Sequence, residues 1–446
     1  MRKKALAVVA ALTALAALAA AAYSRAPAVA VPRAFAPVKE GRLLAVVPGV
    51  RGPVLGRADK RALWIARRSP RLRLFNPGTA WTYSPHGNVL AIATERGGEA
   101  GDPVSSLQLI DPHVLSRLAT VKLGYGHVAQ LAWADNRVNA VVQRWCCPAS
   151  LDVVGVNAET AKIVSQQTFQ NALVGSSRVG STLVLLLAPP VGIGTATLAV
   201  VDPSGAIHTV SLNQIQAGSD LPDEDNPAAA NLHQNRPGLA VDPDGNRAFV
   251  VPASGSVAEI SLATLSVSYH ALAEPVSLLG RLHSWAEPKA VAKGISGPTR
   301  AARWLGSGVI AVTGGDEAVT ATPGEMHITW TPAGLKLIDT NTWGAKLIDR
   351  GADSFTVDRD QLLATGAAWD TTGNRQGMGL ADYGFDGTRR LAVLGGHPAV
   401  VTLVFRGRAY VGVDDERSIK VVDLESGKLK DRHAPLAQLL LGDGSN

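Results

Sequence analysis

Short apolar runs separated by turn-forming residues follow one another along this 446-residue chain. The clearest example is PGLAVDPDGNRAFVVPASGSVAEISLATLSVSYHAL, residues 237–272, whose apolar runs are Leu239–Val241, Ala248–Val251, Val257–Ser261 and Ser266–His270. Pro-Asp-Gly separates the first two runs and favours a turn, because proline presets φ and glycine accepts positive φ. Four short strands in succession predict an antiparallel meander.

The same order of runs recurs with a period of about 40–50 residues. Further units lie at 80–123, 130–169, 172–212, 300–349, 354–394 and 398–430. The third strand usually ends in a residue that can cap the next turn, namely Asp111, Asn157, Asp202, Asp339 or Asp423. One such sheet cannot bury both faces, whereas a ring of sheets can. The pattern therefore predicts an all-β fold, a β-propeller of eight four-stranded blades, with seven blades as the alternative.

The two ends of the repeated region complement each other. Residues 42–78 have the pattern of a unit that lacks its first strand, and PLAQLLLG, 435–442, is an apolar run left over at the other end. We therefore predict that N- and C-terminal strands share one blade and close the ring. Residues 42–446 would then form a single propeller domain.

The first residues have the parts of a secretory signal peptide. A basic start, Met1–Lys4, precedes an apolar stretch, Ala5–Ala22, and small residues follow at Ala28–Ala30. We predict a signal peptide over 1–30 and a linker over 31–41, so that the protein is secreted or extracytoplasmic. The alternative is an uncleaved N-terminal anchor, since 18 apolar residues are just long enough to cross a bilayer. Contact with a membrane is expected only through that segment.

Loss of the leader changes the charge of the protein. The formal net charge is +6, and the leader carries four basic residues and no acidic one, which leaves about +2. The one basic stretch, 51–73, has few interleaved aromatic residues and is typical of a solvated edge. A nucleic-acid partner is therefore not expected.

The unit 239–267 resembles the YVTN-type repeat of secreted bacterial β-propellers, and SPHG (84–87) and LIDP (109–112) resemble the same repeat elsewhere in the chain. The resemblance covers the mature chain as a fold. It implies an exported propeller and no particular activity, because the motifs are structural.

The long connections of such blades should emerge on one side of the disc, which we call the long-loop face. They are the turns between second and third strands and the links between blades: 95–103, 145–150, 188–196, 314–334, 369–377, 213–236 and 273–299. Long loops in compact domains are often functional, and exposed indoles suit stacking on sugars or planar ligands. The candidate ligand residues are Trp145, Cys146, Cys147, Trp285, His327, Trp330, Trp369, Asp370 and Arg375. For each loop tryptophan the alternative is packing of the loop on a blade.

Cys146 and Cys147 are the only cysteines and are adjacent. In an exported protein they form either a vicinal disulfide or two free thiols. The acidic stretch DLPDEDN, 220–226, supplies Asp220, Asp223, Glu224 and Asp225, whose oxygens could hold calcium; a solvated acidic loop is the alternative. No other cofactor is predicted.

Sequence signatures of hydrolases are missing, since neither G-x-S-x-G nor H-E-x-x-H occurs. We therefore expect a non-catalytic interaction module that binds a protein, a glycan or another cell-envelope component through the long-loop face. The alternative is an exported enzyme, either a lactonase-like hydrolase or a quinone- and calcium-dependent dehydrogenase. Adjacent cysteines after Trp145 and the sequence VVDLESGKLK, 421–430, resemble quinoprotein alcohol dehydrogenases, although the tryptophan-docking consensus of that family does not recur.

Overall fold

The structure is a computed structural model. It describes residues 43–49, 52–58, 62–65, 73–75, 77–85, 89–96, 103–111, 116–144, 149–219, 233–273, 297–322, 325–370, 372, 374–405, 407–413 and 418–432. Every regular element in these ranges is a β-strand, which confirms the all-β prediction. No helix in the described ranges is long and apolar enough to cross a membrane.

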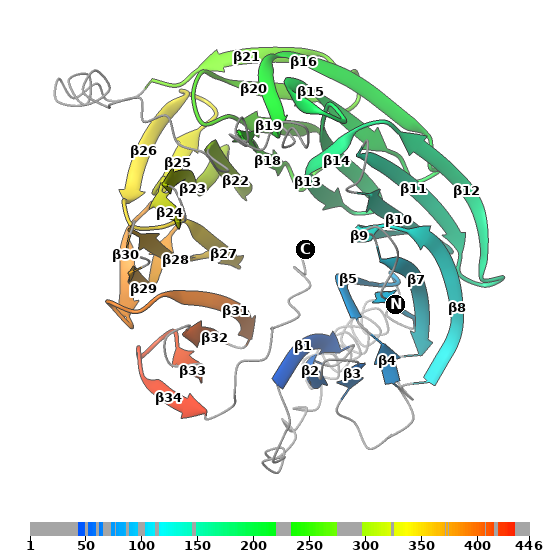
Figure 1. Ribbon diagram of the computed structural model, residues 1–446, viewed down its shortest axis with the longest axis horizontal. Coiled ribbons are helices and arrows are strands. Elements are labelled where there is room, and N and C mark those ends of the chain that lie inside the picture. Colours follow the sequence, from blue (N-terminus) through cyan, green and yellow to red (C-terminus); the bar gives the residue numbers. More distant parts are fainter. Residues whose placement is uncertain are drawn as a thin grey trace, which may run out of the picture.

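Consecutive strands pair antiparallel into sheets, and the sheets follow one another around a ring in chain order (Figure 1). The first half of the chain forms four of them. Their strands are β1 (Leu43–Gly49), β2 (Gly52–Ala58), β3 (Ala62–Ile65) and β4 (Arg73–Phe75); β5 (Pro77–Tyr83), β6 (Leu90–Arg96), β7 (Val104–Asp111) and β8 (Ser116–Tyr125); β9 (His127–Ala134), β10 (Arg137–Arg144), β11 (Ser150–Asn157) and β12 (Lys162–Phe169); and β13 (Ala172–Val179), β14 (Thr182–Ala188), β15 (Gly192–Val201), β16 (Ile207–Ser219) and the short β17 (Gln234–Asn235).

The second half of the chain continues the same order. One four-stranded sheet contains β18 (Gly238–Val241), β19 (Arg247–Val251), β20 (Ser256–Ser261) and β21 (Val267–Ala271), and another contains β31 (Ala399–Phe405), β32 (Arg408–Val413), β33 (Ser418–Asp423) and β34 (Leu429–Arg432). Between them lie β22 (Gly297–Gly306), β23 (Val309–Thr322), β24 (Glu325–Pro332), β25 (Leu335–Asp339), β26 (Gly344–Asp349), β27 (Ser354–Asp358), β28 (Gln361–Trp369), β29 (Arg375–Gly384) and β30 (Arg389–Val393). These nine strands form one continuous sheet, because β24 pairs with β28 and so joins two meanders.

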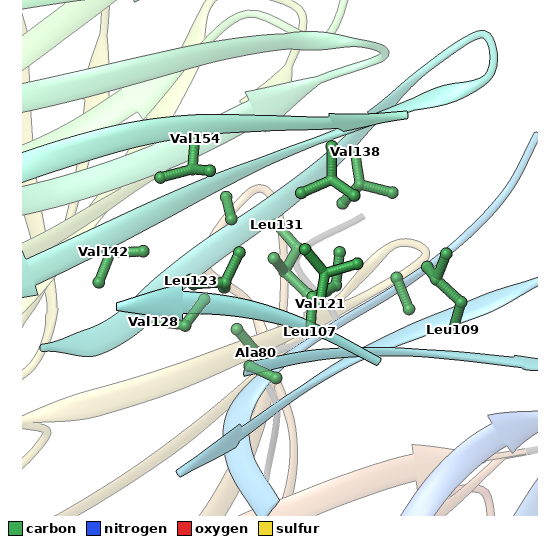
Figure 2. Packing of buried hydrophobic residues seen from close by; sticks show 14 of the residues in the cluster. Ala80, Leu107, Leu109, Val121, Leu123, Val128, Leu131, Val138, Val142 and Val154 are labelled. Atoms are coloured by element: carbon green, nitrogen blue, oxygen red, sulfur yellow. The ribbon is translucent and has the colours of Figure 1, made fainter. Parts of the chain in front are cut away.

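Hydrophobic clusters fill the spaces between neighbouring sheets. One cluster packs alternate residues of β5–β8, such as Leu107 and Leu109, against Val138 and Val142 of β10 (Figure 2). In β14, Leu183 to Leu187 are all almost fully buried. Odd-numbered members contact the preceding sheet and even-numbered members the following one. Coverage on both faces explains why these strands lack polar alternation.

Asparagine and aspartate at the ends of third strands cap the following turns, as predicted. Asn157 Oδ1 accepts the N–H groups of Glu159 and Thr160 at 3.1 and 2.9 Å. Asp202, Asp339 and Asp423 accept backbone N–H groups in the same way. Hydroxyl donors, Ser204 for Asp202 and Ser426 for Asp423, and backbone donors, foremost that of Asn341 for Asp339, lower the pKa of each of the three carboxyls.

The N-terminal sheet has four strands of its own, β1 to β4 in sequential order, where the sequence predicted a sheet that lacks its first strand. Residues 1–42 and 433–446 lie outside the described residues. The leader, the linker and the shared blade therefore stay predictions.

Candidate functional site

Two hairpins lie at positions where the sequence predicted long loops. β23 continues to Thr322 and returns as β24 from Glu325, so most of the predicted loop 314–334 is paired strand. β28 and β29 likewise pair up to Trp369 and Arg375. The prediction of long loops is therefore wrong for most of 314–334 and for 369–377. Strand pairing satisfies the backbone N–H and C=O groups that a long irregular loop would leave to solvent.

Pairing of β24 with β28 brings together three of the candidate residues. Trp330 and Trp369 are register partners, and Arg375 faces Trp369 across the β28–β29 hairpin. The guanidinium of Arg375 lies 4.5 Å from the centre of the Trp369 ring, a cation–π contact. Asp370 caps the hairpin turn by accepting the N–H groups of Thr372 and Asn374 at 2.9 and 3.0 Å.

Trp330 packs into the structure. Its Nε1–H donates to Asp353 Oδ2 at 2.9 Å, and the same oxygen accepts the N–H of Ala367 at 3.1 Å. The Trp330 ring covers Gly315, where an added Cβ would lie 2.3 Å from the indole. Burial raises the pKa of Asp353, and the two hydrogen bonds oppose that rise. Trp330 therefore clamps the β23–β24 hairpin to the neighbouring meander.

A groove of about 820 Å³, which we call the Arg300 groove, opens beside this hairpin. The turn between β19 and β20 forms one wall, and β22, β23 and the start of β25 form the other. The lining mixes apolar and polar residues. It contains Val251, Pro252, Ala253, Leu272, Ala273, Val312, Pro332, Ala333 and Ile338 with the polar residues Ser254, Arg300, Thr313, Asp316 and Lys336.

Arg300 is the most constrained polar group of the groove. Only 12% of its side chain is exposed, and its Nη1 lies 2.8 Å from Asp316 Oδ1 and 3.1 Å from the carbonyl oxygen of Gly315. Asp316 is 57% exposed. The groove thus combines apolar walls with one oriented ion pair, an arrangement typical of ligand sites.

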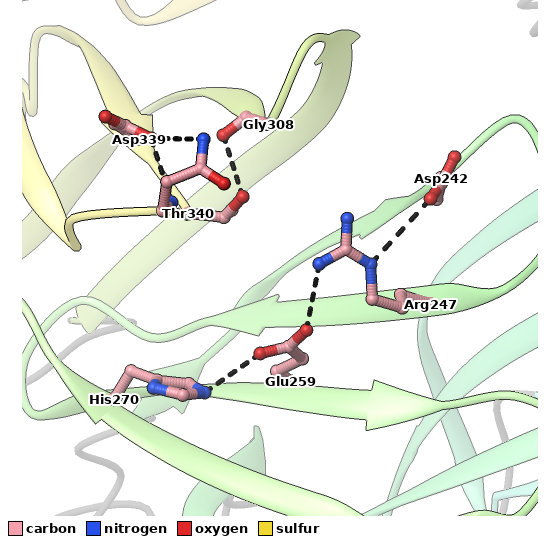
Figure 3. A network of polar contacts seen from close by, with 8 residues as sticks. Asp242, Arg247, Glu259, His270, Gly308, Asp339 and Thr340 are labelled. Atoms are coloured by element: carbon pink, nitrogen blue, oxygen red, sulfur yellow. Dashed lines mark hydrogen bonds and ion pairs between the residues drawn. The ribbon is translucent and has the colours of Figure 1, made fainter.

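A second polar network extends from the β18–β19 turn across β19, β20 and β21 (Figure 3). Arg247 lies between Asp242, 3.8 Å away, and Glu259, 3.1 Å away. His270 Nε2 is 2.9 Å from Glu259 Oε2, outside hydrogen-bond geometry, and its ring stacks on Trp343 at 3.8 Å. These contacts join β18–β21 to the β25–β26 turn, and every partner in them is a residue of the protein, so we interpret them as structural.

Several sequence candidates fall outside the described residues. They are Trp145, Cys146, Cys147, Trp285, Asp220, Asp223, Glu224 and Asp225. His327 pairs with Thr320 through its backbone, and its side chain lies outside the description. In the described part of the chain no three His, Cys, Asp or Glu side chains gather as a metal site. Calcium binding at 220–225 stays a prediction.

Sequence reasoning missed the Arg300 groove, because its walls come from two different repeats. Ala253 and Arg300 are separated by a long inter-blade connection, and neither belongs to a motif. The one feature of the sequence that points to this region is the unusual length of the segment between Val312 and Leu335. It predicts a functional face but does not predict a groove.

Comparison with known proteins supports the fold. No protein-family model and no curated protein matches the chain. Among solved structures, the chain is similar to the dihydro-heme d1 dehydrogenase NirN in complex with DHE, with a TM-score of 0.50 and 14% identity over 93% of this chain and 78% of NirN. It is also similar to the Cps50 (Swd1) β-propeller domain of Myceliophteria thermophila (TM-score 0.38, 11% identity, 80% and 96% coverage) and to BamB of Moraxella catarrhalis (0.35, 12%, 73% and 93%). The succession of four-stranded antiparallel sheets and the likeness to NirN at a TM-score of 0.50 confirm the predicted resemblance as one of fold alone.

Proposed function

We propose that the protein is an exported β-propeller that binds its ligand on the long-loop face, with the Arg300 groove as the principal binding site. The nine-stranded sheet contains two four-stranded meanders and the inserted strand β24. If each meander is one blade, these two and the other six sheets support a count of eight blades. The signal-peptide pattern supports export. The ligand class that fits an exported interaction module is a protein, a glycan or another envelope component.

The observation that carries this proposal is the groove itself. Its volume of about 820 Å³ lies within the range of roughly 300–1,000 Å³ that ligand pockets occupy. Apolar walls supply contact area, and the buried Arg300 and exposed Asp316 supply orientation. The wall that contains β23 and the start of β25 includes part of the long segment 314–334, as expected if this insertion serves binding.

Filling the groove with a large side chain tests the proposal. Ala253 is exposed in the groove wall, and Ala263 is exposed in the β20–β21 turn on the short-turn side of the same sheet. Protein, glycan and lipid fractions of the host envelope are passed over the immobilised wild-type chain, and the retained component is purified. Ala253→Trp should weaken its binding by at least about tenfold, because a filled pocket loses its contact area, while Ala263→Trp should bind like the wild type.

Equal binding by Ala253→Trp and Ala263→Trp would exclude the groove as the binding site. The enzyme alternative is examined on the same wild-type sample by supplying alcohols with a quinone and calcium, or lactones. Turnover of either substrate would favour that alternative over the interaction module.

A further inference from the structure

Arg236 is held rigidly at the start of the sheet formed by β18–β21. Its N–H donates to the carbonyl oxygen of Pro298 at 2.9 Å, and its own carbonyl accepts the N–H of Arg300 at 2.7 Å. These two bonds form a parallel bridge between Arg236 and Thr299. Because both the N–H and the carbonyl of Arg236 are hydrogen-bonded to β22, the direction in which the side chain leaves the backbone is set as well.

The guanidinium of Arg236 makes no hydrogen bond and no ion pair within the part of the chain that the structure describes. The residue is half-buried, and burial lowers its pKa, with no acidic neighbour among the described residues to oppose the change. Other partly buried arginines are paired: Arg137 with Asn139 and Ser165, Arg144 with Asp152, and Arg247 with Glu259. A buried charge without a partner is unfavourable, so its presence indicates a function.

Arg236 ends the inter-blade connection 213–236, which is one of the connections that define the long-loop face, and it lies just before β18. Parallel bridge partners carry their side chains on the same face of a sheet, so Arg236 shares a sheet face with Thr299. Thr299 pairs with Gly315, which the Trp330 ring covers. Among the described residues on this sheet face, Glu317 accepts a hydrogen bond from Gln234 Nε2 at 3.3 Å, and burial raises its pKa. No described residue forms an ion pair with Arg236, so its charge is available to a ligand.

We propose that Arg236 binds an oxyanion, a carboxylate or phosphate group of a ligand, at the inner edge of the long-loop face beside Trp330. The planar guanidinium donates two parallel N–H groups that match the oxygens of such an anion. Arg300, one residue after Thr299, points to the opposite face of β22 and lines the groove. The anion site is therefore separate from the Arg300 groove, and failure of the groove test leaves this proposal standing.

Thermal unfolding of the full mature chain in matched buffers tests the proposal. Chloride, acetate and inorganic phosphate are compared at equal ionic strength, so that general screening is the same. If phosphate or acetate binds the native state, the Tm should be about 2 °C higher than in chloride when the anion concentration is several-fold above its Kd. Whichever of the two anions gives the larger rise identifies the group. Arg236→Gln should abolish the rise, and Arg117→Gln, which changes an exposed arginine of β8, should keep it.

A second variant separates binding from a structural role. Arg236→Met removes the charge and keeps most of the side-chain volume, so in chloride it should unfold at the same or a higher temperature than the wild type. A clear fall in its Tm would mean that another group of the chain pairs with Arg236 in solution, which would overturn the proposal. An equal phosphate-dependent rise in the wild type and Arg236→Gln would overturn it too.

Discussion

Asp382 is a carboxyl in the middle of a sheet. It lies in β29 between Leu363 and Leu391 and is fully buried. Its Oδ2 accepts the Nε2–H of Gln361 at 3.0 Å, whereas Oδ1 has no hydrogen-bond partner among the described residues. Burial raises the pKa of Asp382 from 3.8 to about 6, although the charge of Arg390 acts in the opposite direction. The carboxylate form is therefore unfavourable in the native state.

The raised pKa of Asp382 predicts a pH dependence of stability. A group whose pKa is higher in the folded state stabilises the protein below its unfolded pKa, near 4, and that contribution is lost as pH rises through about 6. Asp382→Asn should therefore be more stable than the wild type at pH 8, and its free energy of unfolding should fall less between pH 4.5 and pH 7. Urea unfolding at these pH values measures the difference. Parallel pH profiles in both proteins would contradict the assignment.

At the scale of elements, the repeated strands could be predicted and the inserted hairpin could not. Ala248–Val251 and Val257–Ser261 were predicted almost to the residue, because each is an apolar run bounded by turn residues. Residues 314–334 contain glycine, threonine and proline with few strongly apolar residues, so their pattern suggests a loop. The hairpin depends on tertiary contacts, above all the pairing of Trp330 with Trp369, and local sequence carries no signal for them.

Removing the clamp should therefore loosen this hairpin selectively. Trp330→Phe keeps an aromatic ring over Gly315 but deletes the N–H that Asp353 accepts. Because the partly buried carboxyl of Asp353 then lacks one hydrogen-bond donor, the free energy of unfolding should fall by about 1–3 kcal/mol. Hydrogen exchange of the β23 and β24 amides should accelerate more than that of β19 and β20. Trp369→Phe, which leaves an aromatic ring beneath Arg375, is the matched control, and equal acceleration in both variants would refute the role of the clamp.

At the scale of the whole molecule, the period of the sequence predicted the propeller fold, whereas the use of the long-loop face for binding stays a prediction. Each repeat must bury both faces, so Leu183–Leu187 alone already indicate a sheet between two neighbours. The Arg300 groove arises where Ala253 and Asp316, from different repeats, come to face each other. That juxtaposition depends on blade geometry and on the length of β23. The proposed anion site at Arg236 rests in addition on the lack of a partner among the described residues, and a sequence pattern gives no sign of that.

Ring closure is the remaining prediction at this scale. The apolar run 435–442 should pair with the N-terminal sheet, because three leucines in succession, Leu439–Leu441, favour burial over exposure. Truncation after Arg432 should then lower the Tm by several degrees, since the first and last sheets lose their shared strand. Truncation after Gly442 removes only Asp443–Asn446 and should leave the Tm unchanged. Because β1–β4 already form four strands, an unchanged Tm in the longer truncation would mean that this sheet is complete without the C-terminal run, and that the ring is held by packing between the first and last sheets alone.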